Sequence, residues 1–392
     1  MFDAHMRVQD LLSRLQKAVS RATSSGAFIA EIDGLRFIAI VAVVAFHLGG
    51  RYFERPARPF WEPGGDIAGW VVYTGFFGVQ LFFVISGFVL ALPFAQAQLA
   101  GGRPVELKKY FWRRITRLQP PYMISLVLFL IVALINNYGK VAADIGKYLE
   151  HLVAHAFYLH GAFYGPLDTP GYFALNHVTW SLEVEVQFYI IAPLLAMVYR
   201  VHDNAKRRML IVLAIIASHT MMYVVPRAPF AVTVVPFLYY FLLGFLLVDI
   251  YIIDWKNQAP KQSYLWDGIG LAAWCVGPFL VGQSHTNDLY VLALILIAYV
   301  ASFRGVLLSS FFRNGWIVAI GGMCYTIYLY HTLMFWPLHQ LWDWLVFGKD
   351  IPTTLSAIMT QIVVLTASVI AISSLLFVLF EKPFMKSKRK LS

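Results

Sequence analysis

The chain has 392 residues, of which 59% are hydrophobic, 16% are aromatic and only 13% are charged, and its formal net charge is +10. Soluble domains carry about 25% charged residues, so this composition excludes an ordinary soluble protein and predicts an all-α, polytopic integral membrane protein. The two cysteines, Cys275 and Cys324, lie far apart in apolar segments, which argues against a disulfide, a cysteine metal site or a haem attachment site.

The first 30 residues lack the uninterrupted apolar stretch of a cleaved signal peptide. Instead, apolar residues recur at helical spacing among basic residues between Met6 and Arg21: Val8, Leu11, Leu12, Leu15 and Val19 alternate with Arg7, Arg14 and Lys17. This pattern predicts a basic amphipathic segment, residues 1–30, that lies on an anionic membrane surface. A frayed polar leader is the alternative.

Ten apolar segments follow, and each is predicted to be a membrane-spanning helix. They are residues 35–50, 70–94, 118–137, 180–200, 209–226, 230–252, 264–282, 288–304, 315–338 and 354–380. With the N-terminus inside, only seven of the 31 basic residues fall on the outer side: Arg51, Arg55, Arg58, Lys140, Lys147, Arg227 and Lys349. Both termini are therefore predicted to be cytoplasmic. The same asymmetry accounts for the net charge, so no nucleic-acid partner is expected.

The first span carries two ionisable side chains on one face. Arg36 and His47 are 11 residues apart, which places them about 16 Å apart along a helix and nearly in line. Asp33 is predicted to cap this helix, and Gly34 to allow a tight turn into the membrane. Arg36 can bind a phosphate or a carboxylate, and His47 can act as a general base. Interfacial snorkelling of Arg36 and an interhelical hydrogen bond of His47 are the alternatives.

A basic motif, "RRITR", precedes the third span. Arg113 and Arg117 are four residues apart on one helical face, with Arg114 beside them. Three guanidinium groups at an inner membrane surface suit a polyphosphate ligand such as a nucleotide or coenzyme A. The alternative is that these residues only anchor the helix at the cytoplasmic side.

The second span contains "GVQLFFVISGFVL", residues 78–90. The small residues Gly78, Ser86 and Gly87 are predicted to allow close helix packing. Gln80 is a polar group that needs a partner within the membrane.

The longest outer connection, about residues 138–179, is rich in histidine, and its first half is predicted to form a short interfacial helix. His151 and His155 are four residues apart, but no matching carboxylate or third ligand is evident. We therefore expect no metal site in this connection.

Two later helices carry polar stripes. Ser181, Glu185 and Tyr189 recur every four residues, whereas Glu183 lies about 200° around the helix from Glu185. The Glu185 carboxylate can orient a histidine or hold an acceptor hydroxyl, or it can serve only as a helix-packing hydrogen bond. In the ninth span Tyr328 and His331, three residues apart, indicate a shared internal cavity or a satisfied core histidine. His219 and Asp249 fit no such pattern and are interpreted as packing or coupling residues.

Taken together, these stretches resemble the membrane-bound acyltransferase-3 family in its stand-alone form, without an extracytoplasmic hydrolase-like domain. Six motifs occur in the family's order across nearly the whole chain. They are "IDGLR…H" from Ile32 to His47, "GVxLFFVxSGF" from Gly78 to Phe88, "RRxxRLxPxY" from Arg113 to Tyr122, "WSLxxExxFY" from Trp180 to Tyr189, "YxxYLxH" from Tyr325 to His331, and "ExPF" from Glu381 to Phe384. Glu183 and Cys324 depart from the usual pattern, which affects acceptor preference more than acyl transfer.

The resemblance implies a multi-pass enzyme of the bacterial inner membrane, with a transmembrane domain over residues 31–385 and a basic tail over residues 386–392. It would transfer an acyl group, most often acetyl, from cytoplasmic acyl-CoA to a hydroxyl of an envelope saccharide or a small acceptor, among membrane lipids. The implied catalytic residues are His47 and Glu185. The implied donor-binding residues are Arg36, Arg113, Arg114 and Arg117, and the expected acceptor-binding residues are Trp180, Ser181, Tyr189, Tyr328 and His331.

Two questions stay open from the sequence. Acyl transfer can proceed directly or through a covalent acyl-histidine. A proton-coupled transporter or flippase for a polar envelope precursor is the alternative function, because buried charges also serve transport. Nevertheless, no internal repeat of the kind found in many transporters is apparent.

Overall fold

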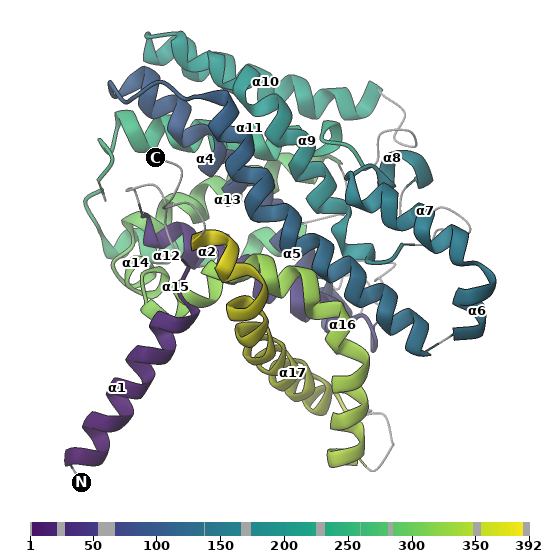
Figure 1. The fold of residues 1–392 in the computed structure, drawn as a ribbon. Coiled ribbons are helices and arrows are strands. Elements are labelled where there is room, and N and C mark those ends of the chain that lie inside the picture. The colour runs from purple at the N-terminus through teal and green to yellow at the C-terminus, as the bar shows by residue number, and fades with distance from the viewer. Residues whose placement is uncertain are drawn as a thin grey trace. The chain divides into compact units, whose positions relative to one another are not determined.

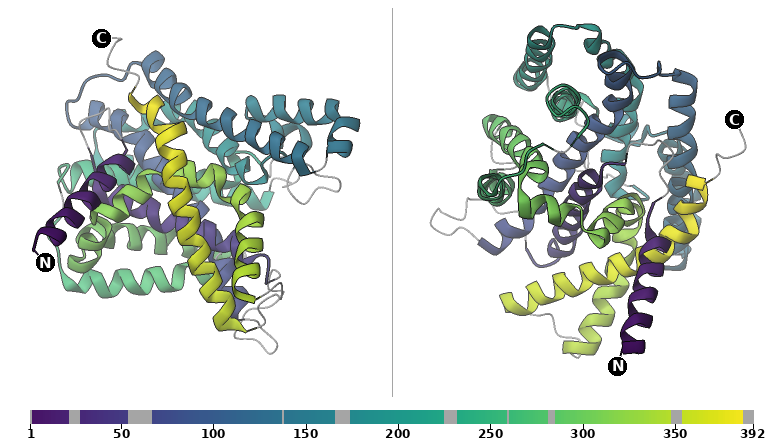
Figure 2. Two further views of the ribbon diagram at one scale, coloured as in Figure 1. Left: turned by 60° about the horizontal axis from the view of Figure 1, so that its bottom comes forward. Right: turned by 90° about the vertical axis from the view of Figure 1, so that its left-hand side faces the viewer.

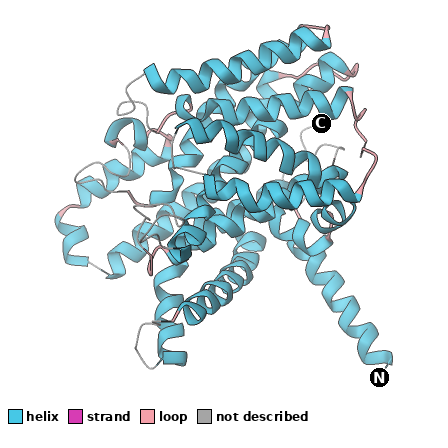
Figure 3. Ribbon diagram, turned by 180° about the vertical axis from the view of Figure 1, so that it is seen from behind, coloured by secondary structure: helices cyan, strands magenta, loops and turns pink. Residues whose placement is uncertain are grey.

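The computed structural model describes residues 2–21, 28–53, 67–136, 138–165, 174–224, 232–258, 260–280, 285–347 and 354–386. Within these ranges every regular element is helical (Figure 3), which confirms the all-α prediction. Arg55, Arg58, Arg227, Lys349 and residues 387–392 of the expected basic tail lie outside the described residues.

Among the described residues, seven helices are long and apolar enough to cross a membrane. They are Ala30–Gly49, Ala68–Leu99, Leu107–Asn136, His177–Arg200, Val235–Ile253, Asn287–Arg304 and Leu355–Met385. An eighth candidate is the pair Gly315–Gly322 and Cys324–Val346, which bends by 69°. These helices agree with a polytopic membrane protein, but the count of ten is not confirmed. The two other expected spans are residues 209–226 and 264–282. The first corresponds to α10 (Asn204–Val224), which is not among the seven candidates. The second corresponds to α12 (Tyr264–Val276), whose 13 residues are too few to span a membrane.

The chain divides into two compact units, and the first combines Met1–Gly78 with Lys261–Ser392. Its helices are α1 (Phe2–Val19), α2 (Ala30–Gly49), α3 (Ile67–Tyr73), α12, α13 (His285–Arg304), α14 (Val306–Phe312), α15 (Gly315–Gly322), α16 (Cys324–Trp342), α17 (Leu355–Leu376) and α18 (Lys382–Lys386). Helix α2 packs against α14, α15, α16 and α17. Helices α16 and α17 run side by side (Figures 1 and 2).

Close packing around α2 explains its glycine and corrects one prediction. Helix α2 begins at Ala30, so Asp33 lies in its first turn rather than at the N-cap. A Cβ atom at Gly34 would overlap the backbone of Phe312, and one at Gly321 would overlap the backbone of Asp33. Gly34 therefore permits helix contact and not the tight turn expected from the sequence.

The expected amphipathic helix at the N-terminus is present as α1. Leu12 and Leu15 expose 44% and 47% of their surface, as an apolar face without a protein partner would. The C-terminal end of α1 is held within the first unit, where Lys382 Nζ donates to the Lys17 carbonyl oxygen at 3.1 Å. The location of this helix on a membrane surface stays a prediction.

The second unit comprises Val79–Pro260. Its helices are most of α4 (Phe77–Leu99), then α5 (Leu107–Asn136), α6 (Tyr138–Ala143), α7 (Ile145–Ala156), α8 (His160–Tyr164), α9 (Trp180–Leu195), α10 (Asn204–Val224) and α11 (Leu238–Ile253). A Cβ atom at Gly87 would overlap the backbone of Phe241, and one at Gly244 would overlap the backbone of α4. The expected close helix packing at Gly87 is thus confirmed, with α11 as the partner.

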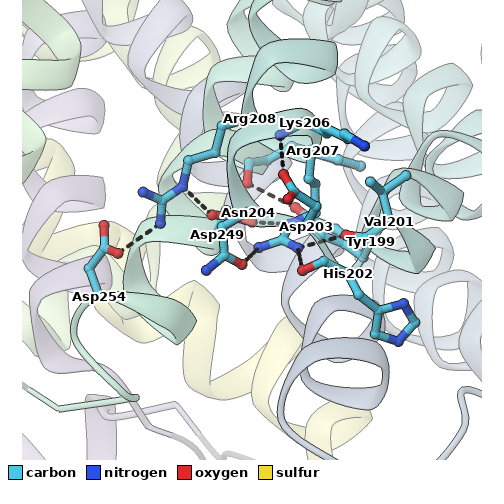
Figure 4. A network of polar contacts seen from close by, with 11 residues as sticks. Tyr199, Val201, His202, Asp203, Asn204, Lys206, Arg207, Arg208, Asp249 and Asp254 are labelled. Atoms are coloured by element: carbon cyan, nitrogen blue, oxygen red, sulfur yellow. Dashed lines mark hydrogen bonds and ion pairs between the residues drawn. The ribbon is translucent and has the colours of Figure 1, made fainter.

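A buried ion-pair network joins α10 to α11 (Figure 4) and gives Asp249 a structural role. The Asp249 carboxylate accepts hydrogen bonds from Arg207 Nε and, at 2.6 Å, from Arg208 Nε. Arg207 also donates to the Val201 carbonyl oxygen at 2.7 Å, and Arg208 donates to Asp254 at 2.8 Å. The side chains of Arg207 and Asp249 are completely buried, so each charge is compensated by the other within the unit. Asp249 is therefore a packing residue of the second unit.

Candidate functional site

Two predicted histidines meet in the first unit. His47 lies on α2 and His331 on α16, 284 residues further along the chain, with His331 Nε2 3.4 Å from His47 Nδ1. The rings are in edge contact with their centroids 5.1 Å apart. His331 is fully buried, whereas His47 is partly exposed. The structure thus brings His331 into contact with the predicted catalytic histidine, while the shared cavity expected from the sequence stays a prediction.

Backbone carbonyls decide which nitrogen of each ring carries the proton. His331 Nδ1 lies 2.8 Å from the Tyr328 carbonyl oxygen; since a carbonyl only accepts, Nδ1 is the donor and Nε2 holds the lone pair. His47 Nδ1 lies 2.9 Å from the Val43 carbonyl oxygen and is likewise the donor. We assign the His47 proton to Nδ1 on this basis, shared between Val43 and His331. The basic lone pair of His47 is then on Nε2, the arrangement a general base or nucleophile needs.

Arg36, on the same helix as His47, is ion-paired. Its Nη1 atom lies 2.6 Å from Asp33 Oδ1, and Arg21 Nε lies 2.7 Å from Asp33 Oδ2. The Asp33 carboxylate is completely buried between the two guanidinium groups. Two positive charges around one negative charge leave a net charge of +1, which still suits an anionic ligand. The pairing also shows that Arg36 is held by the protein and does not simply snorkel to the interface.

Tyr328 and the closing motif complete the surroundings of α16. The half-buried Tyr328 ring has its centroid 6.2 Å from that of His331, and its carbonyl orients the imidazole. Glu381 of the closing motif is buried and accepts a hydrogen bond from Thr326 Oγ1 at 2.5 Å. Glu381 therefore ties the C-terminal helix to α16.

A second polar group surrounds Glu185 in the second unit. Its Oε1 atom accepts hydrogen bonds from Ser86 Oγ, at 2.6 Å, and from the Tyr189 hydroxyl. The contact between Glu185 and Tyr189 confirms the stripe expected on this helix. Ser86 was interpreted from the sequence only as a small packing residue; the neighbouring Gly87 performs that task, and Ser86 provides a hydroxyl to the carboxylate. The sequence held no signal for this contact, because Ser86 and Glu185 are 99 residues apart.

The basic motif divides between two environments. The Arg114 guanidinium lies over the Tyr110 and Tyr189 rings, 5.8 and 5.6 Å from their centroids, and within electrostatic reach of Glu185. Arg113 is exposed, and Arg117 is half-buried. Arg114, rather than Arg113, therefore faces the polar stripe of α9.

Trp180 and Ser181 are the other predicted acceptor-binding residues of the second unit, and both lie in the first turn of α9. Trp180 packs on Phe83 and Phe237 with centroids 6.5 and 5.5 Å away, and Ser181 is half-buried in the first turn of α9. Gln80 is buried, and its Oε1 atom has no hydrogen-bond partner within the described part of the chain. The acceptor-binding roles of Trp180 and Ser181 stay predictions.

The histidine-rich connection folds into α7 and α8, in line with the short helix expected there. His155 and His160 lie on the two helices with their rings stacked, centroids 3.9 Å apart. Burial lowers the pKa of His155 to about 3, so its imidazole is neutral at physiological pH. No carboxylate that could join these histidines was evident from the sequence. The structure provides one in Glu183, whose Oε1 atom lies 3.6 Å from His155 Nδ1.

Comparison with known proteins identifies relatives over most of the chain. The family model of an acyltransferase domain, that of the acyltransferase-3 family, matches residues 29–378. A protein of Staphylococcus aureus strain COL, provisionally named an O-acetyltransferase, is 27% identical over 333 residues, which is 78% of this chain and 50% of the relative. The O-acetyltransferase OatA of Staphylococcus aureus strain NCTC 8325 is 25% identical over 327 residues, with the same two shares.

The peptidoglycan O-acetyltransferase OatA of Listeria monocytogenes is 29% identical over 180 residues, which cover 44% of this chain and 25% of the relative. The chain thus spans about half the length of the first relatives it matches. No solved structure gave a significant match.

Proposed function

Because this chain belongs to the acyltransferase-3 family, we propose that it transfers an acyl group, acetyl in the first place, from acyl-CoA to a hydroxyl of a cell-envelope saccharide. The observation that carries the proposal is the pair of His47 and His331, in which two backbone carbonyls leave the lone pair of His47 on Nε2. The relatives named O-acetyltransferases support the acetyl group and the oxygen acceptor.

In this reaction His47 Nε2 removes the proton from the acceptor hydroxyl while the oxygen attacks the thioester carbonyl carbon. The C–S bond then breaks, and the proton passes from the imidazolium to the departing thiolate, so that CoA–SH and the acyl ester are the products. The shared Nδ1–H contact with His331 stabilises the imidazolium between these two steps. The same lone pair would form an acyl-imidazole if the reaction were covalent.

The donor would be held through its phosphates by guanidinium groups. Arg113 and Arg117 are accessible for this contact, while Arg36 and Arg114 are already placed by Asp33 and by two tyrosine rings. For the acceptor, the carboxylate of Glu185 would hold or orient a sugar hydroxyl, and the indole of Trp180 would contact an apolar sugar face. A cytoplasmic donor and an outer acceptor would place the enzyme in the inner membrane.

The test uses the full chain, purified in detergent and returned to liposomes, with isotope-labelled acetyl-CoA and an envelope glycan fraction. We expect acceptor-dependent release of CoA and a labelled glycan ester. The His47→Ala variant should lose this activity, whereas His202→Gln, which changes an exposed histidine, should keep it. Mass spectrometry of envelope glycans from cells with and without the gene would then identify the acceptor by the mass of one acyl group.

Full transfer activity in His47→Ala would show that the assigned base is wrong. A protein that never consumes acetyl-CoA, yet moves an envelope precursor across the membrane in a His47-dependent way, would instead establish the transporter alternative.

A further inference from the structure

We propose that His155, His160 and Glu183 bind a zinc ion that fastens α7 and α8 to α9. One ligand atom of each residue lies within 4.8 Å of those of the other two, and all three side chains are buried. Both ligand types, imidazole and carboxylate, are established zinc ligands, and three protein ligands with an open position is a common zinc arrangement. Zinc binding by these residues does not depend on the acyl-transfer reaction.

Two polar atoms of this cluster lack partners among the described residues. His155 Nε2 and Glu183 Oε1 are both inaccessible, and neither makes a hydrogen bond. Glu183 uses its other oxygen to accept from the Gly161 amide at 2.8 Å, and no described lysine or arginine pairs with the carboxylate. A buried, unpaired polar group costs free energy, and a buried carboxylate costs more, unless a cation compensates it. A bound divalent ion would satisfy both atoms at once.

The backbone between the two histidines is held in a conformation that brings them together. Helix α7 ends in a Schellman-type turn, in which Leu159 N donates to the Ala154 carbonyl and Tyr158 N to the His155 carbonyl, both at 2.9 Å. Tyr158 has φ of 58°, a left-handed conformation that favours glycine and is strained for a tyrosine. Strain of this kind persists only where the surroundings enforce it. In this turn it returns His160 onto His155.

His151 supports His160 from the side of α7. Its Nδ1 atom lies 2.8 Å from His160 Nε2. When His160 Nε2–H donates to His151, the Nδ1 atom of His160 holds the lone pair that a metal ligand requires. Such an outer contact commonly fixes the tautomer and orientation of a metal-binding histidine.

Binding must draw the ligands closer together. With metal–ligand bonds of about 2.0–2.2 Å and tetrahedral angles, ligand atoms lie roughly 3.4 Å apart, which is less than in the present cluster. The His155 and His160 rings are parallel within 5°, so at least one ring must tilt for both in-plane lone pairs to point at one ion. The three-residue connection Phe157–Leu159 and the single turn of α8 are the elements that would move.

The position of Glu183 places the ion away from the proposed acceptor-binding carboxylate. Glu183 and Glu185 are two residues apart, about 200° around α9, so the ion would lie on the helix face opposite to Ser86 and Tyr189. It would not reach a substrate held by Glu185. Its effect would be to hold the α7–α8 segment against the helix that presents Glu185.

The test is zinc binding by the full chain in detergent after removal of metal with a chelator. We expect one zinc ion per chain, measured by elemental mass spectrometry and by titration with ZnCl₂ against a chromophoric chelator. Loss of a residue that only contacts a metal ligand weakens metal binding by about 10- to 100-fold. Glu183→Gln and His155→Gln each remove a ligand itself, so each should weaken zinc binding at least 100-fold. The controls Glu150→Gln and His202→Gln change exposed residues of the same unit and should bind like wild type.

A zinc content that is the same in the Glu183→Gln/His155→Gln double variant as in the controls would overturn the proposal, as would wild-type protein that takes up no zinc. Cobalt-loaded wild type provides a readout that does not depend on whether the variants fold. The intense visible bands of four-coordinate Co²⁺ would support the buried site. The weak spectrum of six-coordinate Co²⁺ would show surface binding only and would contradict it.

Discussion

His331 Nε2 lies 3.4 Å from His47 Nδ1, so the Nδ1–H group of His47 has two acceptors. They are the Val43 carbonyl oxygen and the Nε2 atom of the buried His331 ring. The Val43 carbonyl sets the nitrogen that carries the proton, and the contact with His331 helps to hold the orientation of the His47 imidazole. His331 has no need to touch the acceptor to affect the reaction. We therefore regard it as a positioning residue for His47, in addition to the cavity role expected from the sequence.

Replacement of His331 should separate positioning from simple packing. His331→Leu removes the acceptor for the Nδ1–H group, and we expect kcat to fall about 10- to 100-fold, within the range that general-base catalysis contributes. His331→Gln can place an amide oxygen near the position of Nε2 and should retain more activity than the leucine variant. The KM for acetyl-CoA should remain unchanged in both. Equal losses in the two variants would show that only the volume of the ring matters.

Ser86 should matter more than its size suggests. Ser86→Ala removes a hydrogen bond to the Glu185 carboxylate, and a bond to a charged group is worth about 1.5–3 kcal/mol. We expect kcat/KM for acyl transfer to fall about 10- to 100-fold, because the carboxylate loses its fixed position. Ser125→Ala is the matched control, since the buried Ser125 hydroxyl donates only to the Tyr122 carbonyl of its own helix. If the two alanine variants behave alike, the contact with Glu185 has no role in the reaction.

Asp249 should determine stability and not chemistry. Asp249→Asn leaves the buried Arg207 guanidinium without its counter-charge, and breaking such a pair costs about 3–5 kcal/mol. We expect a lower melting temperature in detergent, measured by intrinsic fluorescence, with unchanged kcat for the fraction that stays folded. Asp254→Asn, which alters an exposed partner of Arg208, should cost only about 0–1 kcal/mol. A stable but inactive Asp249→Asn variant would contradict a purely structural role.

The packing of α2 allows a direct steric test in the first unit. Gly34→Ala forces a methyl group into the backbone of Phe312, and overpacking of this kind costs about 1–3 kcal/mol. Gly268→Ala is the control, because a Cβ atom at Gly268 in α12 meets nothing within 4 Å. Alanine should stabilise that helix by up to about 1 kcal/mol. Thermal melts of the two variants should therefore shift in opposite directions, and a neutral Gly34→Ala would show that α2 has room to move.

Several features of the site follow from the sequence because they depend on local geometry alone. The composition predicted helices within a membrane, and the helical period predicted that Tyr189 would reach Glu185 one turn away. The same period placed Arg36 and His47 on one face of α2. Such relations need only 3.6 residues per turn, which a single helix provides whatever surrounds it.

Other features depend on how distant segments pack, and periodicity does not encode this. The orientation of α5 selects Arg114 over Arg113 for the contact with Tyr189, and Asp33 proved to lie between Arg21 and Arg36 instead of capping α2. A count of apolar segments also could not separate a spanning helix from one of 13 residues such as α12, since both are equally hydrophobic over a short window.

The sequence by itself determined the class of the protein, the family it belongs to and the reactive residue types, because these are properties of composition, spacing and ordered motifs. Only the tertiary structure decided the partners: His331 for His47, Ser86 for Glu185, and the meeting of His155, His160 and Glu183. The physical reason is that each of these contacts joins side chains from different helices. Their contact is set by close packing between helices, to which every residue in the interface contributes.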